Sequence, residues 1–124
     1  MDEETQPKVA EIPRIWVVVA DSEQARFFEA ESCIGALREL GGMKQLTGSE
    51  DKTKHFAREV ANRLDVEGQQ GAFDRLVIAA NPAFLPTLRA YLSSRVRELV
   101  AEELSKDLVH DSADQVRRNL PIHL

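Results

Sequence analysis

Two uninterrupted apolar runs constrain the fold of this chain more than any other feature of the sequence. Ile15–Ala20 reads IWVVVA, and Leu76–Ala80 reads LVIAA within the segment Phe73–Ala80. Continuous runs of this kind, rich in β-branched residues, are typical of strands that are covered on both faces in the interior of a sheet. We therefore predict an α/β fold with Ile15–Ala20 as its central strand and Phe73–Ala80 as a second buried strand.

The residues after the first run predict an antiparallel start to the sheet. The polar break Asp21–Glu23 is followed by Ala25–Ala30 in a strand-like pattern, which favours a hairpin. Ala36–Leu40 alternates weakly, and it fits either a third strand or a helical turn. Gly41–Ser49 is predicted as a loop because the glycine pair at its start interrupts the pattern.

A helix is predicted after this loop, and either Ser49 or Asp51 serves as its N-cap. Its apolar residues recur every four positions and form one face: Phe56, Val60 and Leu64. The opposite face is charged, so the helix is expected to pack on a sheet. The glycine-containing run Glu67–Gly71 is predicted to end it.

Shorter elements are predicted in the second half of the chain. After Asn81, either Pro82–Leu85 is a separate tight turn or the next helix starts at Pro86, since a proline is tolerated only in the first helical turn. Val96–Leu104 is helical in composition yet lies where an α/β sheet needs a strand. For this segment we predict a helix to about Arg97 and a strand over Leu99–Glu103.

A capping-box pattern at Ser112–Gln115 predicts a last helix, which Pro121 stops. Strands that alternate with helices imply right-handed parallel crossovers, whereas the first strands pair antiparallel. The predicted fold is therefore a mixed β-sheet, with an N-terminal hairpin or meander followed by βαβ units and flanking helices.

The length of 124 residues suits one compact domain. Residues 1–13 contain acidic residues and two prolines but few apolar residues, so we predict a flexible acidic tail there and a single domain over 14–124. The longest apolar run is far shorter than the roughly 20 residues of a membrane-spanning helix, and no leader pattern opens the chain. We expect no membrane insertion and a cytoplasmic location.

Charge and cysteine content exclude further classes. Sixteen basic and 21 acidic residues give a net charge of −5, which argues against strong nonspecific binding to nucleic acid. The single cysteine, Cys33, excludes an internal disulfide and offers no paired thiolate for a metal. No phosphate-binding or dinucleotide motif is present, so we expect no bound cofactor.

Three polar residues follow the predicted parallel strands. Asp21 follows the first strand, Asn81 the second buried strand and Asp107 the third. The carboxyl ends of parallel strands meet at one edge, where ligands tend to bind. The three side chains could hold Mg²⁺ through their oxygens, with Asp21 and Asp107 as the carboxylate ligands, or position a water. Turn, cap and loop roles explain the same residues more simply. His110 is either a base near Asp107 or a surface loop histidine.

Several phrases, taken together and in this order, resemble a bacterial family described as host attachment proteins, "required for attachment to host cells". The resemblance extends from about Arg14 to Leu120. The phrases that carry it are Trp16–Asp21 (WVVVAD), Ala25–Phe28 (ARFF), Phe73–Ala80 (FDRLVIAA) with Pro82, and Glu103–Leu108 (ELSKDL).

That family is similar in turn to the middle domain of archaeal and eukaryotic peptide release factors and Pelota-like factors, which has a ribonuclease-H-like fold. The resemblance implies a mixed sheet and a partner that is a protein, the ribosome or RNA. Release factors hydrolyse peptidyl-tRNA with a Gly-Gly-Gln loop, but Gly41-Gly42 is followed here by Met43. The resemblance therefore does not extend to that activity.

The leading hypothesis from the sequence is a noncatalytic intracellular interaction domain with a translation-related partner. The alternative is a metal-dependent hydrolase or nuclease that uses Asp21, Asn81 and Asp107. A homodimer that exposes a sheet edge or a helix face as its functional surface is a third hypothesis.

Overall fold

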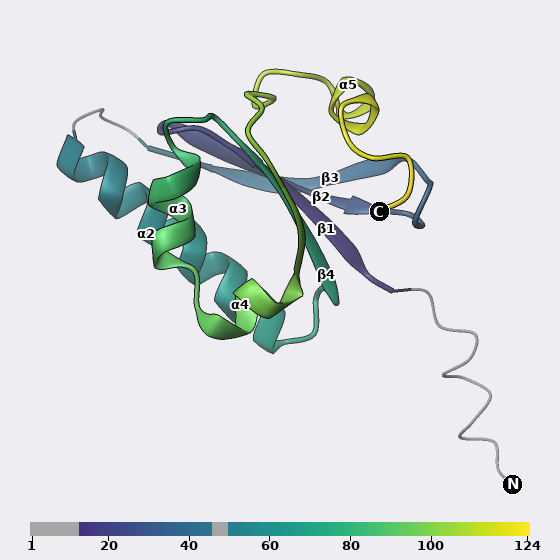
Figure 1. The fold of residues 1–124 in the computed structure, drawn as a ribbon, viewed down its shortest axis with the longest axis horizontal. Helices are drawn as coiled ribbons and strands as arrows, with labels where there is room; N and C mark the ends of the chain where they lie inside the picture. The colour runs from purple at the N-terminus through teal and green to yellow at the C-terminus, as the bar shows by residue number, and fades with distance from the viewer. Residues whose placement is uncertain (1–12, 46–49) are drawn as a thin grey trace, which may run out of the picture.

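The computed structural model describes residues 13–45 and 50–124, and it confirms the predicted α/β architecture with a mixed sheet (Figure 1). The predicted tail, residues 1–13, lies outside the described residues except for Pro13. The elements are β1 (Ile15–Ala20), β2 (Gln24–Ala30), β3 (Leu37–Lys44), α2 (Glu50–Gln69), β4 (Arg75–Ala80), α3 (Leu85–Tyr91), α4 (Ser94–Leu99), β5 (Val100–Leu104) and α5 (Ala113–Arg118).

The five strands form one sheet in the order β3-β2-β1-β4-β5. β1 pairs antiparallel with β2, and β2 pairs antiparallel with β3. On the other side, β1 pairs parallel with β4, and β4 pairs parallel with β5. β1 is therefore the central strand, as its uninterrupted apolar sequence predicts, and all six of its residues are buried.

Both faces of the sheet are covered, but by different layers (Figure 1). α2, α3 and α4 pack on one face, where the alternate residues Trp16 and Val18 of β1 point. On the other face Val17 and Val19 pack against the C-terminal segment 108–124, which includes α5. The alternation along β1 divides its side chains between two apolar cores, because successive residues of a strand point to opposite faces.

The third strand corrects the prediction at Gly41 and Gly42. β3 does not stop there but continues to Lys44, and the predicted loop is wrong over Gly41–Lys44. The two glycines stay paired with β2, opposite Phe27 and Arg26, after a register shift that leaves Leu40 as an extra residue. Pairing with a neighbouring strand thus outweighs the low intrinsic strand preference of glycine.

The first helix is also longer than predicted, because α2 runs through Gly68 and ends at Gln69. A Cβ at Gly68 would lie 3.3 Å from Cζ of Phe73, so this glycine lets the helix pack closely on a buried aromatic ring. Gly71 makes the turn after the helix with a φ of 78°. The predicted caps, Ser49 and Asp51, lie outside the described side chains.

The remaining elements follow the predictions closely. Pro82–Phe84 forms a separate turn and α3 starts at Leu85, with Pro86 in its first turn. Ser93 caps α4, which gives way to β5 at Val100. At the last helix, Ser112 and Gln115 form the predicted capping box. No helix among the described residues is both long enough and apolar enough to span a bilayer.

Candidate functional site

The carboxyl edge of the parallel strands brings together part of the predicted polar set. Asn81, directly after β4, donates its side-chain amide to Oδ2 of Asp107 at 3.1 Å. Asp21, directly after β1, lines a hollow of about 260 Å³ together with Asn81 and Phe84. Asn81 is therefore hydrogen-bonded to Asp107 and shares a hollow with Asp21.

The same side chains also shape the local backbone. Oδ1 of Asp21 accepts hydrogen bonds from the amides of Glu23 and Gln24 at 2.8 and 2.9 Å, which closes the turn between β1 and β2. Oδ1 of Asn81 accepts from the amide of Ala83 at 2.8 Å. Turn formation thus accounts for one carboxylate oxygen of Asp21 and for the single side-chain oxygen of Asn81, and a role in binding Mg²⁺ stays a prediction.

His110 reaches the Asp21 turn only through the side chain of Gln24. It is exposed, and its Nδ1 is 3.4 Å from Nε2 of Gln24 at the start of β2. Within residues 13–45 and 50–124, no three His, Cys, Asp or Glu side chains are grouped closely enough to hold a metal ion.

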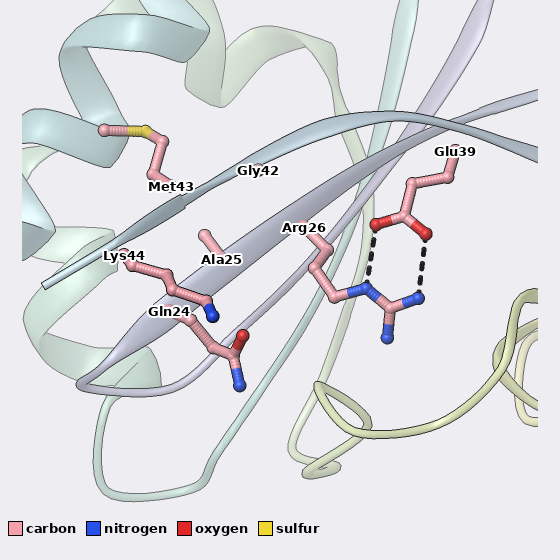
Figure 2. Close-up of a pocket in the computed structure, with 7 residues that line it drawn as sticks. All are labelled: Gln24, Ala25, Arg26, Glu39, Gly42, Met43 and Lys44. Atoms are coloured by element: carbon pink, nitrogen blue, oxygen red, sulfur yellow. Dashed lines mark hydrogen bonds and ion pairs between the residues drawn. The ribbon is translucent and has the colours of Figure 1, made fainter.

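A second hollow, which the sequence did not predict, lies over the first residues of β2 and the last residues of β3 (Figure 2). Its volume is about 430 Å³. We call it the β2–β3 groove, and the residues that line it are Gln24, Ala25, Arg26, Glu39, Gly42, Met43 and Lys44. The groove could not be predicted while Gly41–Ser49 was expected to be a loop. Three of its seven lining residues, Gly42, Met43 and Lys44, belong to the end of β3.

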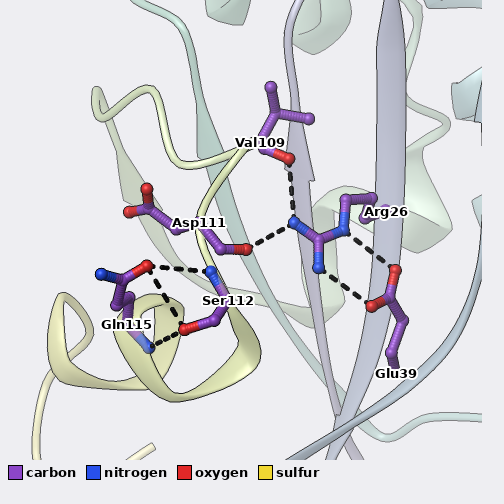
Figure 3. Close-up of polar contacts among 6 residues, drawn as sticks. All are labelled: Arg26, Glu39, Val109, Asp111, Ser112 and Gln115. Atoms are coloured by element: carbon purple, nitrogen blue, oxygen red, sulfur yellow. Dashed lines mark hydrogen bonds and ion pairs between the residues drawn. The ribbon is translucent and has the colours of Figure 1, made fainter.

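Arg26 connects the groove to the C-terminal layer (Figure 3). Its Nε and Nη2 donate to the two carboxylate oxygens of Glu39, each at 2.9 Å, and so join β2 to β3. Its Nη1 donates to the carbonyl oxygens of Val109 and Asp111 at 2.9 and 2.6 Å. The guanidinium also lies 5.1 Å from the ring centroid of Phe28. One side chain thereby ties two strands to the segment that leads into α5.

The segment held by Arg26 continues directly into the capping box of α5 (Figure 3). The hydroxyl of Ser112 accepts from the amide of Gln115 at 3.2 Å, and the Gln115 side chain accepts from the amide of Ser112 at 3.1 Å. These reciprocal bonds satisfy amides at the start of a short helix that would otherwise lack partners. The position of α5 therefore depends on a local cap and on a distant arginine.

The bidentate pair changes the proton affinity of Glu39. The hydrogen bond from Arg26 lowers the pKa of Glu39 below its ordinary value of 4.5, and the pKa of Arg26 is raised by the same bond. Because the charged carboxylate is the form that the folded state favours, the pair contributes stability above the ordinary carboxyl pKa. This contribution is lost as the pH falls through the pKa of folded Glu39.

We therefore expect Glu39→Gln to destabilise the fold at neutral pH, and we expect the difference from the wild type to shrink as the pH falls through the lowered pKa of folded Glu39. Urea unfolding of wild type and variant at several pH values measures this difference. Glu31→Gln, at an exposed position in the connection between β2 and β3, is the control. A Glu39→Gln effect that is constant with pH would contradict the assigned ion pair.

Comparison with known proteins places this chain in a sequence family. The model of a family described as "Protein required for attachment to host cells" matches residues 41–120, which run from the middle of β3 to the end of α5. An uncharacterized protein of Rickettsia prowazekii (strain Madrid E) is 34% identical over 67 residues. That match covers 52% of this chain and 45% of the relative, so it spans less than half of the relative's length.

The fold is similar to that of domains in two archaeal proteins of known structure. The archaeal translation termination factor aRF1 matches 88% of this chain with a TM-score of 0.60 and 14% identity. Pelota of Archaeoglobus fulgidus matches 94% with a TM-score of 0.59 and 14% identity. This chain covers 35% and 34% of those proteins, and the likeness concerns the fold.

These comparisons confirm both resemblances that the sequence suggested. The family model covers the last two of the quoted phrases, Phe73–Ala80 and Glu103–Leu108, and the structural matches cover 88% and 94% of the chain. The family model matches well over half of the residues of this chain. This chain therefore belongs to the family of proteins described as required for attachment to host cells.

Proposed function

We propose that this chain is a noncatalytic intracellular interaction domain that binds a component of the translation machinery, with the ribosome as the first partner to test. The observation that carries the proposal is the match of 88% of the chain to part of an archaeal translation termination factor.

The helical layer offers a surface that suits such a partner. Lys54 and Arg58 of α2 are exposed, and their spacing of four residues places them on the same side of the helix. The guanidinium of Arg58 lies 5.4 Å from the ring centroid of Tyr91 on α3. Cations bind RNA phosphates, and aromatic or guanidinium planes stack on unpaired bases. We therefore assign the contact with ribosomal RNA to this part of α2 and α3.

Co-sedimentation with purified ribosomes tests the proposal. The wild-type chain should pellet with ribosomes at low salt and be released as salt rises, because phosphate contacts release counterions. Lys54→Glu and Arg58→Glu should each weaken binding about fivefold or more, since each replaces an attraction to phosphate by a repulsion. The matched control is Arg118→Glu, which makes the same charge change at an exposed position of α5, on the other side of the sheet.

Two results would count against this proposal in different ways. A wild-type chain that stays in the supernatant at low salt would overturn the ribosome as partner. Equal losses for Arg58→Glu and Arg118→Glu would leave the partner intact but overturn the assigned surface.

The carboxyl edge of the sheet supports a second proposal, a metal-dependent hydrolase or nuclease. The hydrogen bond between Asn81 and Asp107, and the hollow that Asn81 shares with Asp21, are the observations in its favour. These residues would supply oxygen ligands to Mg²⁺. Titration with Mg²⁺ followed by calorimetry should then give a binding signal that Asp21→Asn and Asp107→Asn remove, and a wild-type chain without a signal would refute this proposal.

A further inference from the structure

Two isoleucines beside the C-terminal segment are exposed and share one hollow. Ile34, in the connection between β2 and β3, is 63% exposed, and Ile122, near the end of the chain, is 84% exposed. They are the most exposed large apolar side chains of the described residues. The hollow has a volume of about 300 Å³. We call it the isoleucine hollow, and its lining residues are Ile34, Gly35, Ala36, Arg117, Arg118, Leu120 and Ile122.

Exposed apolar side chains that occur singly are ordinary, but those that gather around a hollow mark an interaction surface. Here the two sides of the hollow come from distant parts of the sequence, and Arg117 joins them. Its guanidinium donates to the carbonyl oxygens of Gly35 and Ile122, each at 2.7 Å. The hollow is therefore held in shape before anything binds, which reduces the conformational entropy that binding has to overcome.

The electrostatics of the hollow favour an acidic occupant. Its lining contains Arg117 and Arg118 and no acidic residue. Among the described residues, the Arg117 guanidinium donates to carbonyl oxygens and not to a carboxylate, so its charge is not neutralised. A segment that combines apolar residues with carboxylates would match both the exposed isoleucines and this positive charge.

Residues 1–12 of the same chain have this composition. They contain four acidic residues and one lysine, together with two large apolar residues, Val9 and Ile12. At about 3.3 Å per residue, twelve residues in extended form span up to about 40 Å. This reach exceeds the radius of gyration of a domain of this size, which is about 13 Å.

The point at which residues 1–12 join the domain lies at the same end of the sheet as the hollow (Figure 1). β1 begins at Ile15, which pairs with Ala30 at the end of β2, directly before the connection that carries Ile34. Arg75, the parallel partner of Ile15, donates to the carbonyl oxygen of Leu124. Both sides of the hollow are therefore close in the fold to the first residues of β1.

We propose that residues 1–12 bind in the isoleucine hollow, with Val9 and Ile12 against the two exposed isoleucines and the acidic residues near the two arginines. Covalent attachment makes this binding intramolecular, so a small contact suffices. The surface on α2 that we assign to RNA lies on the opposite face of the sheet. Loss of the contact in the hollow should leave ribosome binding unchanged, and the two proposals fail independently.

Paramagnetic relaxation in the full chain tests this proposal. Cys33→Ser combined with Gln6→Cys leaves one thiol, within residues 1–12, to carry a nitroxide. The nitroxide should strongly broaden the NMR signals of the Ile34 and Ile122 amides. It should broaden the amide signal of Val66 far less, because Val66 lies on α2, on the other side of the sheet.

Substitutions in the hollow separate specific binding from simple attachment. Ile34→Asp and Ile122→Asp each place a carboxylate where the apolar contact forms, so each should lower the equilibrium constant for binding about tenfold and reduce the broadening. Val66→Asp, the same kind of change at an exposed position of α2, should leave the broadening unchanged. Glu3→Lys combined with Glu4→Lys should reduce it as well, since these changes place cations near the arginines.

Three outcomes would overturn the proposal. The Ile34 and Ile122 signals could broaden no more than that of Val66, which would show that residues 1–12 do not bind there. Broadening that Ile34→Asp and Ile122→Asp leave unchanged in folded variants would reflect attachment alone. In a mixture, nitroxide-labelled chains that broaden these signals in isotope-labelled chains without a nitroxide would make a second copy the occupant.

Discussion

Phe27→Ala is expected to lower the free energy of unfolding by about 3–5 kcal/mol, the largest effect of any single change that we predict. Phe27 is 1% exposed and points from β2 into the core beneath α2. Its ring centroid is 6.1 Å from that of Trp16, and the guanidinium of Arg63 lies 5.4 Å from it. Truncation removes the buried apolar surface and leaves a cavity between strand and helix, which neighbouring side chains fill only in part.

Urea unfolding followed by circular dichroism measures this loss. The total free energy of unfolding of a domain is about 5–15 kcal/mol, so the variant should unfold at a much lower urea concentration than the wild type. Val66→Ala is the control, because Val66 lies on α2 with 50% of its surface exposed, and its truncation should change stability by less than about 0.5 kcal/mol. A loss below about 1 kcal/mol for Phe27→Ala would show that this core is packed differently.

Arg117→Met is expected to cost about 2–3 kcal/mol and to loosen the C-terminal segment selectively. The guanidinium of Arg117 donates to the carbonyl oxygen of Gly35 at 2.7 Å, of Pro121 at 2.8 Å and of Ile122 at 2.7 Å. A longer contact of 3.4 Å reaches the carbonyl of Cys33. Methionine keeps the aliphatic stem but none of these donors, so the connection between β2 and β3 loses its side-chain link to the end of the chain and keeps the backbone hydrogen bond from Leu124 to Cys33.

Hydrogen exchange distinguishes this local effect from global unfolding. The amide of Leu124 donates to the carbonyl oxygen of Cys33 at 2.8 Å, and it should exchange much faster in Arg117→Met. The exchange rates of β4 amides should rise only by the amount that the loss of global stability accounts for. Arg118→Met, at the exposed neighbouring position, should leave both rates unchanged. Arg117→Lys should recover only part of the loss, because one ammonium cannot reach carbonyls in a planar fork. Equal acceleration at β4 and at Leu124 would contradict the proposed clamp.

The candidate site was predictable to the extent that strand order determines it. The rule that parallel strands end at one edge placed Asp21, Asn81 and Asp107 together, and the structure contains the contact between Asn81 and Asp107. The same reasoning missed Arg26. An arginine in a strand gives no sign of its partners when these are carbonyls more than 80 positions away in the sequence.

Elements with a strong local sequence pattern could be predicted without knowledge of the fold. Ile15–Ala20 and Leu76–Ala80 have no polar residue to place in solvent, so they had to become buried strands. The capping box likewise involves only Ser112 and Gln115, so it can be recognised from the sequence without knowledge of the fold.

Elsewhere, tertiary contacts outweigh weak local preferences, and the sequence pattern alone does not predict the outcome. Gly41 and Gly42 belong to a strand because β2 lies beside them, and Gly68 stays helical because Phe73 packs against it. The second face of the sheet is covered by the C-terminal segment, which Arg26 and Arg117 hold through distant carbonyls. Each of these outcomes depends on contacts between residues far apart in the chain, whose free energy exceeds the small local preference that a sequence pattern reports.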